Sequence, residues 1–408
     1  MLTRTFVAPV AGWIVLLTAG LAADVEPSLS VIPNIQPGLD DAWKRTIPGF
    51  GPRIAVVDRV APGQKIDLRV FLLDPDSDPA SRWTYRLETR GPREHISGPE
   101  KELLLAEGEL LMTGHVVQAL QHMSIVFDEA DPIGKRRVSV VATDPSTGRT
   151  LRAEAELELV TTDQLLTGAF TGGDALKWLI EYFQFPRPHE LPAVMDAWAV
   201  HPARQKPGAR GIDNEGALLG FFAAVWADNP WLHKRLLDEL LKREGAIAEF
   251  WSMCLAYALR DAGGDSIAVP QAAEAKLERW RGTNWPEPEA RPTRGSQLDA
   301  YWGEFFATGR LAPVRGIVDA LAMHAHVEDL RRYRESAKKR RPVPPAVLRG
   351  AVFGSAIWSL ASNARQYRLV RAYAEGLLAR DDLPEDVAQL LREALDTDDP
   401  ARLRQKYR

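Results

Sequence analysis

Apolar and polar side chains alternate along residues 51–162, which is the pattern of β-strands with one buried face. One such run covers 65–73, and shorter runs at 54–58 and 83–89 predict two further strands. Within 65–73, the apolar side chains occupy every second position, at Ile66, Leu68, Val70 and Leu72. The opposite face is expected to carry Lys65, Asp67, Arg69 and Phe71.

Two alternating runs, 134–143 and 149–160, flank the turn sequence Pro145-Ser-Thr-Gly148. Alternating strands on both sides of such a turn predict an antiparallel hairpin. Several short strands at this spacing favour an antiparallel β-sandwich. The hairpin, together with the turn at Pro62-Gly63, resembles the immunoglobulin-like modules that are common in exported bacterial proteins. This resemblance implies a fold over about 110 residues and brings no functional residues with it.

From about Leu165 onward, apolar residues recur every three or four positions, which is the period of amphipathic α-helices. Asp174 is a suitable N-cap for the first helix, and Pro186 lies just beyond its end. Prolines within 282–295 interrupt the pattern and predict a linker. The expected helices cover 174–183, 189–200, 214–226, 231–242, 245–261, 272–281, 297–308, 312–334, 345–362, 367–380 and a segment that begins near 383.

An internal repeat runs through the helical part. Its three units begin near Gly220, Trp302 and Ser355, and each combines an aromatic-rich helix, a small polar turn and an amphipathic helix. The units lie about 80 and about 55 residues apart, so they form no strict array. Their texture is similar to tetratricopeptide-type helical hairpins, whose motif and fixed period they lack. The phrases Phe-Phe-Ala-Thr-Gly and Trp-Ser-Leu-Ala-Ser-Asn-Ala also resemble uncharacterised exported bacterial proteins, a resemblance that implies no activity.

These patterns predict an α+β multidomain fold, in which an N-terminal antiparallel, immunoglobulin-like β-sandwich precedes an all-α, irregular helical-repeat domain. The sandwich is expected over 51–162 and the helical domain over 165–408. Residues 24–50 contain four prolines and little apolar periodicity, which predicts an extended lead-in. Trp43 and Ile47 of this lead-in are candidates to pack on the next domain.

The first 23 residues have the three parts of a secretory signal peptide. Arg4 supplies a positive start, residues 6–21 are apolar, and small residues precede Asp24. We therefore expect cleavage near Ala22 or Ala23 and a periplasmic or secreted bacterial protein. The alternative is a retained membrane anchor, because the apolar stretch is close to the minimum length for spanning a bilayer.

Composition narrows the class of protein further. A single cysteine, Cys254, excludes an intramolecular disulfide, and its apolar helical surroundings predict a buried thiol. The chain has 51 basic and 55 acidic residues, and this net charge of −4 provides no field that would attract nucleic acid. No later run matches the apolar N-terminal stretch, so no integral membrane span is expected after cleavage.

The eight histidines form no metal-binding pattern in the sequence. His324 and His326 are two positions apart and would point to different sides of a helix, and His115 and His122 are seven positions apart. Zinc sites on helices favour pairs four positions apart. The sequence therefore predicts no metal site and no cofactor.

Residues 74–79 partly match a calcium loop, because Asp74, Asp76 and Asp78 alternate as calcium ligands do. Pro79 stands where such a loop needs glycine, however, and Tyr85 stands where it needs a bidentate glutamate. An acidic turn between strands is the favoured interpretation, and a loose calcium site is the alternative.

The helical part contains two further candidate binding features, a basic run and a tryptophan in the linker. Seven cations within 331–341 predict a solvated helix end, with docking to anionic lipid or peptidoglycan as the alternative. Trp285 lies in the 282–295 linker, away from the helical spacing of the neighbouring tryptophans. It is therefore a candidate either to dock on the helices or to bind a ligand.

The sequence contains no nucleophile elbow, phosphate loop or dinucleotide fingerprint, and it identifies no catalytic residue. The leading hypothesis is a non-catalytic periplasmic binding or scaffolding protein, since helical hairpin arrays present grooves to partners. Its partner would be another envelope protein or an envelope polymer. The alternative is a cell-envelope enzyme, directed at a glycan, whose acidic catalytic residues the sequence does not identify. A pocket that joins two carboxylates with shifted pKa values would favour the enzyme.

Overall fold

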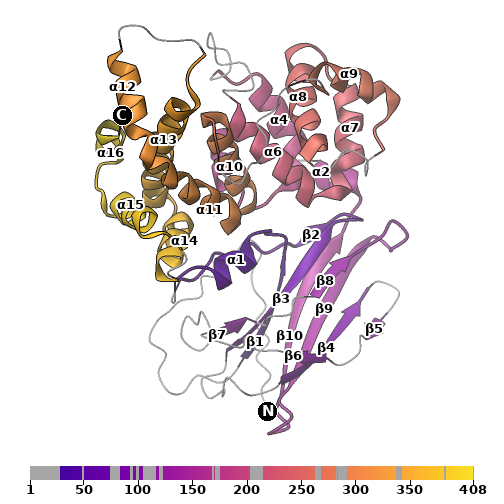
Figure 1. Ribbon diagram of the computed structural model, residues 1–408. Coiled ribbons are helices and arrows are strands. Elements are labelled where there is room, and N and C mark those ends of the chain that lie inside the picture. Colours follow the sequence, from indigo (N-terminus) through magenta and orange to yellow (C-terminus); the bar gives the residue numbers. More distant parts are fainter. Residues whose placement is uncertain are drawn as a thin grey trace.

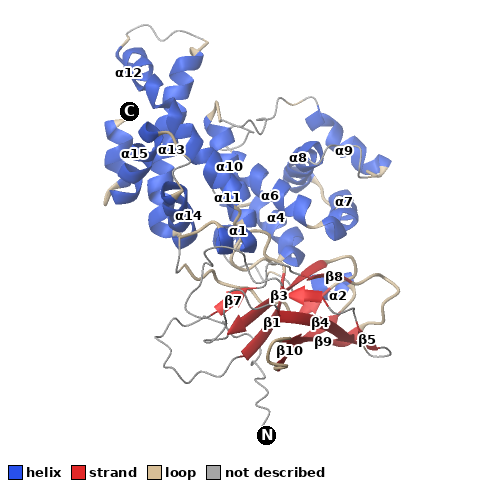
Figure 2. Cartoon of the chain, turned by 60° about the horizontal axis from the view of Figure 1, so that its bottom comes forward, coloured by secondary structure: helices blue, strands red, loops and turns tan. Residues whose placement is uncertain are grey.

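Strands occupy the N-terminal part of the chain and helices the C-terminal part, in a computed structural model (Figures 1 and 2). The structure describes residues 28–47, 50–73, 83–91, 95–97, 101–103, 116–118, 123–167, 170, 175–202, 215–261, 268–281, 283, 292–336, 342–380 and 383–407. We call the two sheets the β layer and the helices from α3 to α16 the helical array.

Two sheets make up the β layer. The first contains β1 (Ser28–Asn34), β3 (Lys65–Leu73), β7 (Val116–Gln118) and β8 (Met123–Val126). The second contains β2 (Arg59–Val60), β4 (Trp83–Arg90), β5 (His95–Ser97), β6 (Lys101–Leu103), β9 (Gly134–Thr143) and β10 (Thr150–Leu159). β2 pairs in parallel with β10, and the other strand pairs of the described residues are antiparallel.

The inner faces of the two sheets share one apolar core. Trp83 and Val140 of the second sheet meet the apolar positions of β3 in this core. The strands predicted at 65–73 and 83–89 are thus confirmed, and so is the hairpin, in which β9 pairs with β10 from Thr143–Thr150 to Gly134–Leu159. The four inner side chains of β3 are the predicted Ile66, Leu68, Val70 and Leu72.

The strand predicted at 54–58 is wrong, because the ladder on this segment begins only at β2. Its backbone is bound in other ways. The Ala55 N–H donates to the side-chain oxygen of Gln36, and the Val57 N–H donates to the carbonyl of Pro33. The apolar residues of this run therefore pack beside the first sheet, and the carbonyl of Asp58 at the end of the run accepts from the Glu158 N–H of β10, where the β2 ladder begins.

The described part of the expected lead-in, 24–50, also differs from the prediction. The whole length of strand β1 pairs with residues 67–73 of β3, and helix α1 (Leu39–Lys44) follows it. Leu39 and Trp43 of α1 pack against Phe71, with the Trp43 and Phe71 ring centroids 5.5 Å apart. The helix therefore covers the outer face of the first sheet. From the alternation of apolar and polar residues alone, this face was expected to be exposed to solvent.

The helical array begins after α2 (Thr162–Leu166). Its α-helices are α3 (Ala175–Glu181), α4 (Leu191–Ala199), α6 (Gly216–Asp228), α7 (His233–Leu241), α8 (Gly245–Asp261), α9 (Gln271–Arg281), α10 (Gly295–Thr308), α11 (Leu311–Asp319), α12 (Val327–Glu335), α13 (Pro345–Gln366), α14 (Arg368–Ala379), α15 (Glu385–Asp396) and α16 (Pro400–Lys406). Short 3₁₀ helices are η1 (Pro188–Glu190), η3 (Pro230–Leu232) and η4 (Ala320–His326). No helix among the described ranges is both long enough and apolar enough to cross a bilayer.

The predicted helices correspond to helices of the structure, with one correction. The single helix expected at 312–334 is divided, because η4 winds more tightly between α11 and α12. The change of direction places α12 against α13, where a Cβ on Gly350 would lie 2.4 Å from the carbonyl oxygen of His326. The α-helical and 3₁₀ periods of 3.6 and 3.0 residues per turn differ too little over seven residues for the pattern of apolar positions to reveal the break.

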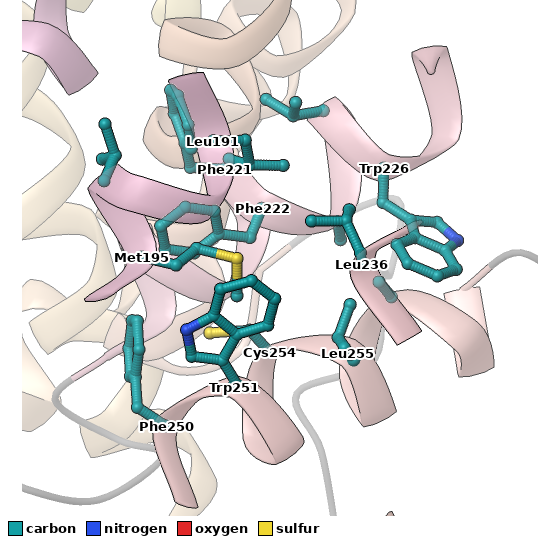
Figure 3. Packing of buried hydrophobic residues seen from close by; sticks show 14 of the residues in the cluster. Leu191, Met195, Phe221, Phe222, Trp226, Leu236, Phe250, Trp251, Cys254 and Leu255 are labelled. Atoms are coloured by element: carbon teal, nitrogen blue, oxygen red, sulfur yellow. The ribbon is translucent and has the colours of Figure 1, made fainter. Parts of the chain in front are cut away.

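Two apolar clusters form the interior of the helical array. The first lies among α3 to α9 and contains Cys254, whose predicted burial is confirmed at 0% exposure. Figure 3 shows Cys254 beside Met195 and Trp251 in this cluster. The second lies among α10 to α16 and includes Trp302, whose indole N–H donates to Ser359 at 3.0 Å.

Helices α6 and α10 join these two clusters through an unusually close crossing. A Cβ on Gly220 would lie 2.2 Å from the Ala300 carbonyl oxygen, and one on Gly303 would lie 1.9 Å from that of Ala217. Gly216 approaches Ser296 in the same way, one turn earlier on both helices, so the two helices run parallel. Only glycine allows such backbone contact, and it fixes α6 and α10 as one central pair.

Candidate functional site

A pocket of about 440 Å³ opens to solvent where α7, α8 and α9 meet. Gly245, at a left-handed φ of +58°, lets the chain turn from α7 into α8. The small side chains Ala248 and Ser252 of α8 and the large ring of Trp280 of α9 line the pocket. The charged lining residues are Arg243, Glu244, Glu249, Lys276 and Arg279.

Two of the lining cations are already satisfied within the chain. Arg243 donates to both carboxylate oxygens of Asp196, at 3.1 and 2.8 Å, and also pairs with Glu239. Burial opposes the ionisation of Glu239, but hydrogen bonds from Lys242 and Arg243 outweigh it and lower the Glu239 pKa. Lys276 donates to three carbonyls at the end of α7, those of Leu240, Leu241 and Arg243. Both cations therefore hold the helices together.

The outer wall of the pocket is more accessible. Arg279 pairs with Glu249 at 3.0 Å, and its guanidinium lies 5.3 Å from the Trp280 ring centroid. The Ser252 hydroxyl, by contrast, is 4% exposed and donates to the Ala248 carbonyl. A partly buried aromatic ring beside an exposed ion pair is suited to stacking with a ligand that has an apolar face.

Among the described residues, two carboxyl groups have a raised pKa, and both lie outside the pocket. Asp228 is at the C-terminal end of α6, and Asp299 is in α10, where burial raises its pKa. Burial raises the pKa of Asp228, and a 2.7 Å hydrogen bond from Arg310 opposes the shift. The other carboxylate oxygen of Asp228 is buried without a hydrogen-bond partner. Next to it, Asn229 bonds the buried Tyr182, whose pKa burial also raises. Asp228 does not line the pocket.

Asp228 should make the stability of the protein depend on pH. Because the folded protein binds the Asp228 proton more tightly than the unfolded chain, stability contributed by this group falls as pH rises through its folded pKa. Asp228→Asn keeps an acceptor for Arg310 and removes the titration. Urea unfolding from about pH 4 to about pH 7 should therefore show a smaller loss of stability in the variant than in the wild type. Parallel curves for the two proteins would contradict this assignment.

The histidines singled out in the sequence have ordinary structural partners. His324 lies 3.6 Å from Asp386, and His326 lies 3.2 Å from Asp329. His115 and His122 lie outside the described residues, as does the acidic turn 74–79. Among the residues the structure describes, no group of three or more His, Cys, Asp or Glu side chains is placed to hold a metal.

The remaining sequence candidates are only partly described. Trp285 lies outside the described residues, together with 284–291 of the expected linker. In the basic run, Arg331 and Arg332 are exposed and both pair with Glu328, whereas 337–341 are not described. Arg331 and Arg332 are therefore solvated, as the favoured interpretation of a solvated helix end predicts, and their ion pairs are exposed ones.

Sequence reasoning did not identify the pocket between α7, α8 and α9. Its lining residues are drawn from three helices between Arg243 and Trp280, and no motif spacing connects them. The one available signal was Trp280 at the end of an expected helix, where a large aromatic side chain is followed at once by the linker.

Comparison with protein-family models gives no match for this chain, and no curated protein matches it either.

Proposed function

We propose that the protein is a non-catalytic binding or scaffolding protein of the bacterial cell envelope. One observation carries the proposal: the pocket and the two described carboxyl groups with a raised pKa, Asp228 and Asp299, lie in different places. The pocket acids Glu244 and Glu249 lie beside cations, and Glu249 is paired with Arg279. Asp228 has a shifted pKa but is bound by Arg310 outside the pocket. An acid–base pair would need a carboxyl group with a shifted pKa inside the pocket.

The proposal includes two finer assignments of fold. We assign the β layer to the immunoglobulin-like sandwiches, and the shared core of its two sheets supports this assignment. We assign the helical array to irregular helical repeats. In support, α6 and α10, which begin the first two sequence units, lie side by side in the same direction. Repeats of this kind expose broad surfaces to their partners.

The proposed partner is another envelope protein or an envelope polymer, bound at the wall formed by Trp280. Trp280→Ala should remove most of the material that the mature protein retains from a cell-envelope extract, because the ring supplies the apolar contact of the pocket. Trp358→Ala is the matched control, since Trp358 also lies under an arginine, Arg404, at 4.9 Å. Equal losses in the two variants, or no loss in either, would contradict a binding role for the pocket.

The alternative, a glycan-directed envelope enzyme, is favoured by the raised pKa values of Asp228 and Asp299, because a carboxyl group with a raised pKa can act as a general acid. Asp228, which has Arg310 beside it, is the one tested. Incubation of the wild type with peptidoglycan, with Asp228→Asn as control, tests it. Release of soluble fragments by the wild type but not by the variant would replace the binding proposal with the enzymatic one.

The envelope location depends on the N-terminal segment, for which we propose cleavage near Ala22 or Ala23. The mature chain in a periplasmic or secreted fraction should then begin at Ala23 or Asp24, as N-terminal sequencing would show. An intact Met1 on protein from the soluble cytoplasmic fraction would contradict export, and an intact Met1 in the membrane fraction would indicate the retained anchor.

A further inference from the structure

The β layer meets the helical array at the C-terminal ends of the two central helices. Because α6 and α10 run parallel, both of these ends face the same side of the array, and Figure 1 shows the β layer beneath it. The ends are joined to each other by the 2.7 Å hydrogen bond from Arg310, which follows α10, to Asp228 of α6. Each end has its own contact with the β layer.

The first contact is made by the segment that leads into α1, at the end of α10. A Cβ on Gly38 would lie 2.3 Å from the carbonyl carbon of Gly309, so the two backbones touch. Tyr373 donates to the Gly309 carbonyl at 2.7 Å from the array side. Asp41 of α1 accepts the Leu311 N–H at 2.9 Å and thereby caps α11.

Gln36 reinforces this contact from within the protein. Its side chain is 6% exposed, and its amide nitrogen donates to the carbonyls of Phe183 and Gln184 in the array, at 3.3 and 3.1 Å. Its oxygen accepts from Asn34 and Ala55 of the β layer, at 2.8 Å each. The one buried amide of Gln36 is therefore hydrogen-bonded to both the β layer and the helical array.

The second contact lies at the end of α6. Gly63, in the turn before β3, has a left-handed φ of +77°, and a Cβ on it would lie 3.2 Å from the Cβ of Trp231. Trp231 also packs on a small apolar cluster made of Ala61, Val160 and Leu165. Beside it, Arg235 of α7 pairs with Asp163 of α2 at 3.0 Å.

We infer that the protein acts as one rigid body, in which the β layer is fixed to the central helix pair at two points. Rotation of the β layer about either contact breaks the other, and the tight crossing of α6 and α10 prevents the two points from moving apart. Domains joined by small polar interfaces usually move relative to each other, whereas backbone contacts and a buried amide bind these parts. A partner that touches both parts then meets a preformed surface. The inference does not depend on whether the protein binds or catalyses.

Hydrogen exchange of the mature full-length protein in increasing urea tests the inference. Peptides from β9 and β10 and peptides from α6 and α10 should lose protection at one common urea concentration in the wild type. In Gly38→Val, the strand peptides and the helix peptides should lose protection at two different urea concentrations, because the added side chain forces the first contact apart. Gly295→Ala is the control, since a Cβ there meets nothing within 4 Å, and it should leave them coincident.

Gly63→Ala provides the same test at the second contact, should Gly38→Val fail to fold. Two separate concentrations in the wild type would overturn the inference, because the parts would then open independently. Coincident concentrations in a folded Gly38→Val protein would also overturn it, since the contact would not be the one that couples the parts. If neither variant folds, the wild-type measurement alone decides.

Discussion

Gly303→Ala should lower the free energy of unfolding by about 3 kcal/mol, the upper part of the usual range for overpacked positions. A Cβ at this position would lie 1.9 Å from the carbonyl oxygen of Ala217 and 2.8 Å from the backbone nitrogen of Phe221. Both obstacles are backbone atoms of α6, so no side chain can rotate out of the way. The helices must separate, and the side chains packed around their crossing lose contacts with them.

Urea unfolding of the variant and of Gly295→Ala measures this effect. Gly295 begins the same helix but a Cβ there meets nothing within 4 Å, so the control should be neutral or stabilising by up to about 1 kcal/mol. A loss below about 1 kcal/mol in Gly303→Ala would show that the crossing is looser than the structure has it.

Gln36→Ala should lower the free energy of unfolding by about 3 kcal/mol, because a buried donor or acceptor left without a partner costs roughly 1–3 kcal/mol. The substitution leaves the Ala55 N–H and the side chain of Asn34 without the oxygen that they share. It also removes the donor from two carbonyls of the helical array.

Gln366→Ala is the control for this prediction, since the exposed Gln366 amide donates to Ser362 in the same helix. Its effect should stay within about 0.5 kcal/mol, as is usual for surface positions. A similar small change in Gln36→Ala would mean that water satisfies the groups around Gln36 and that the amide does not join the two parts.

The local elements of this protein could be predicted from the sequence because their signals lie within a few residues. The alternation in 65–73 sends Ile66 and its apolar companions into one core, and the helix expected at 245–261 has the same bounds in the structure. Both periods follow from the geometry of a single strand or helix. The burial of Cys254 followed in the same way from its apolar helical neighbours.

The tertiary structure alone decided how these elements are used. Arg69, on the outer face of β3, is 2% exposed because α1 covers it and Asp40 pairs with it at 2.6 Å. The crossing of α6 and α10 and the pocket beside Trp280 likewise join segments that no local period relates. Hydrophobic periodicity reports which side of an element is buried and not which distant segment buries it. For that reason the sequence determined the strands and helices, whereas long-range packing determined the junction and the candidate site.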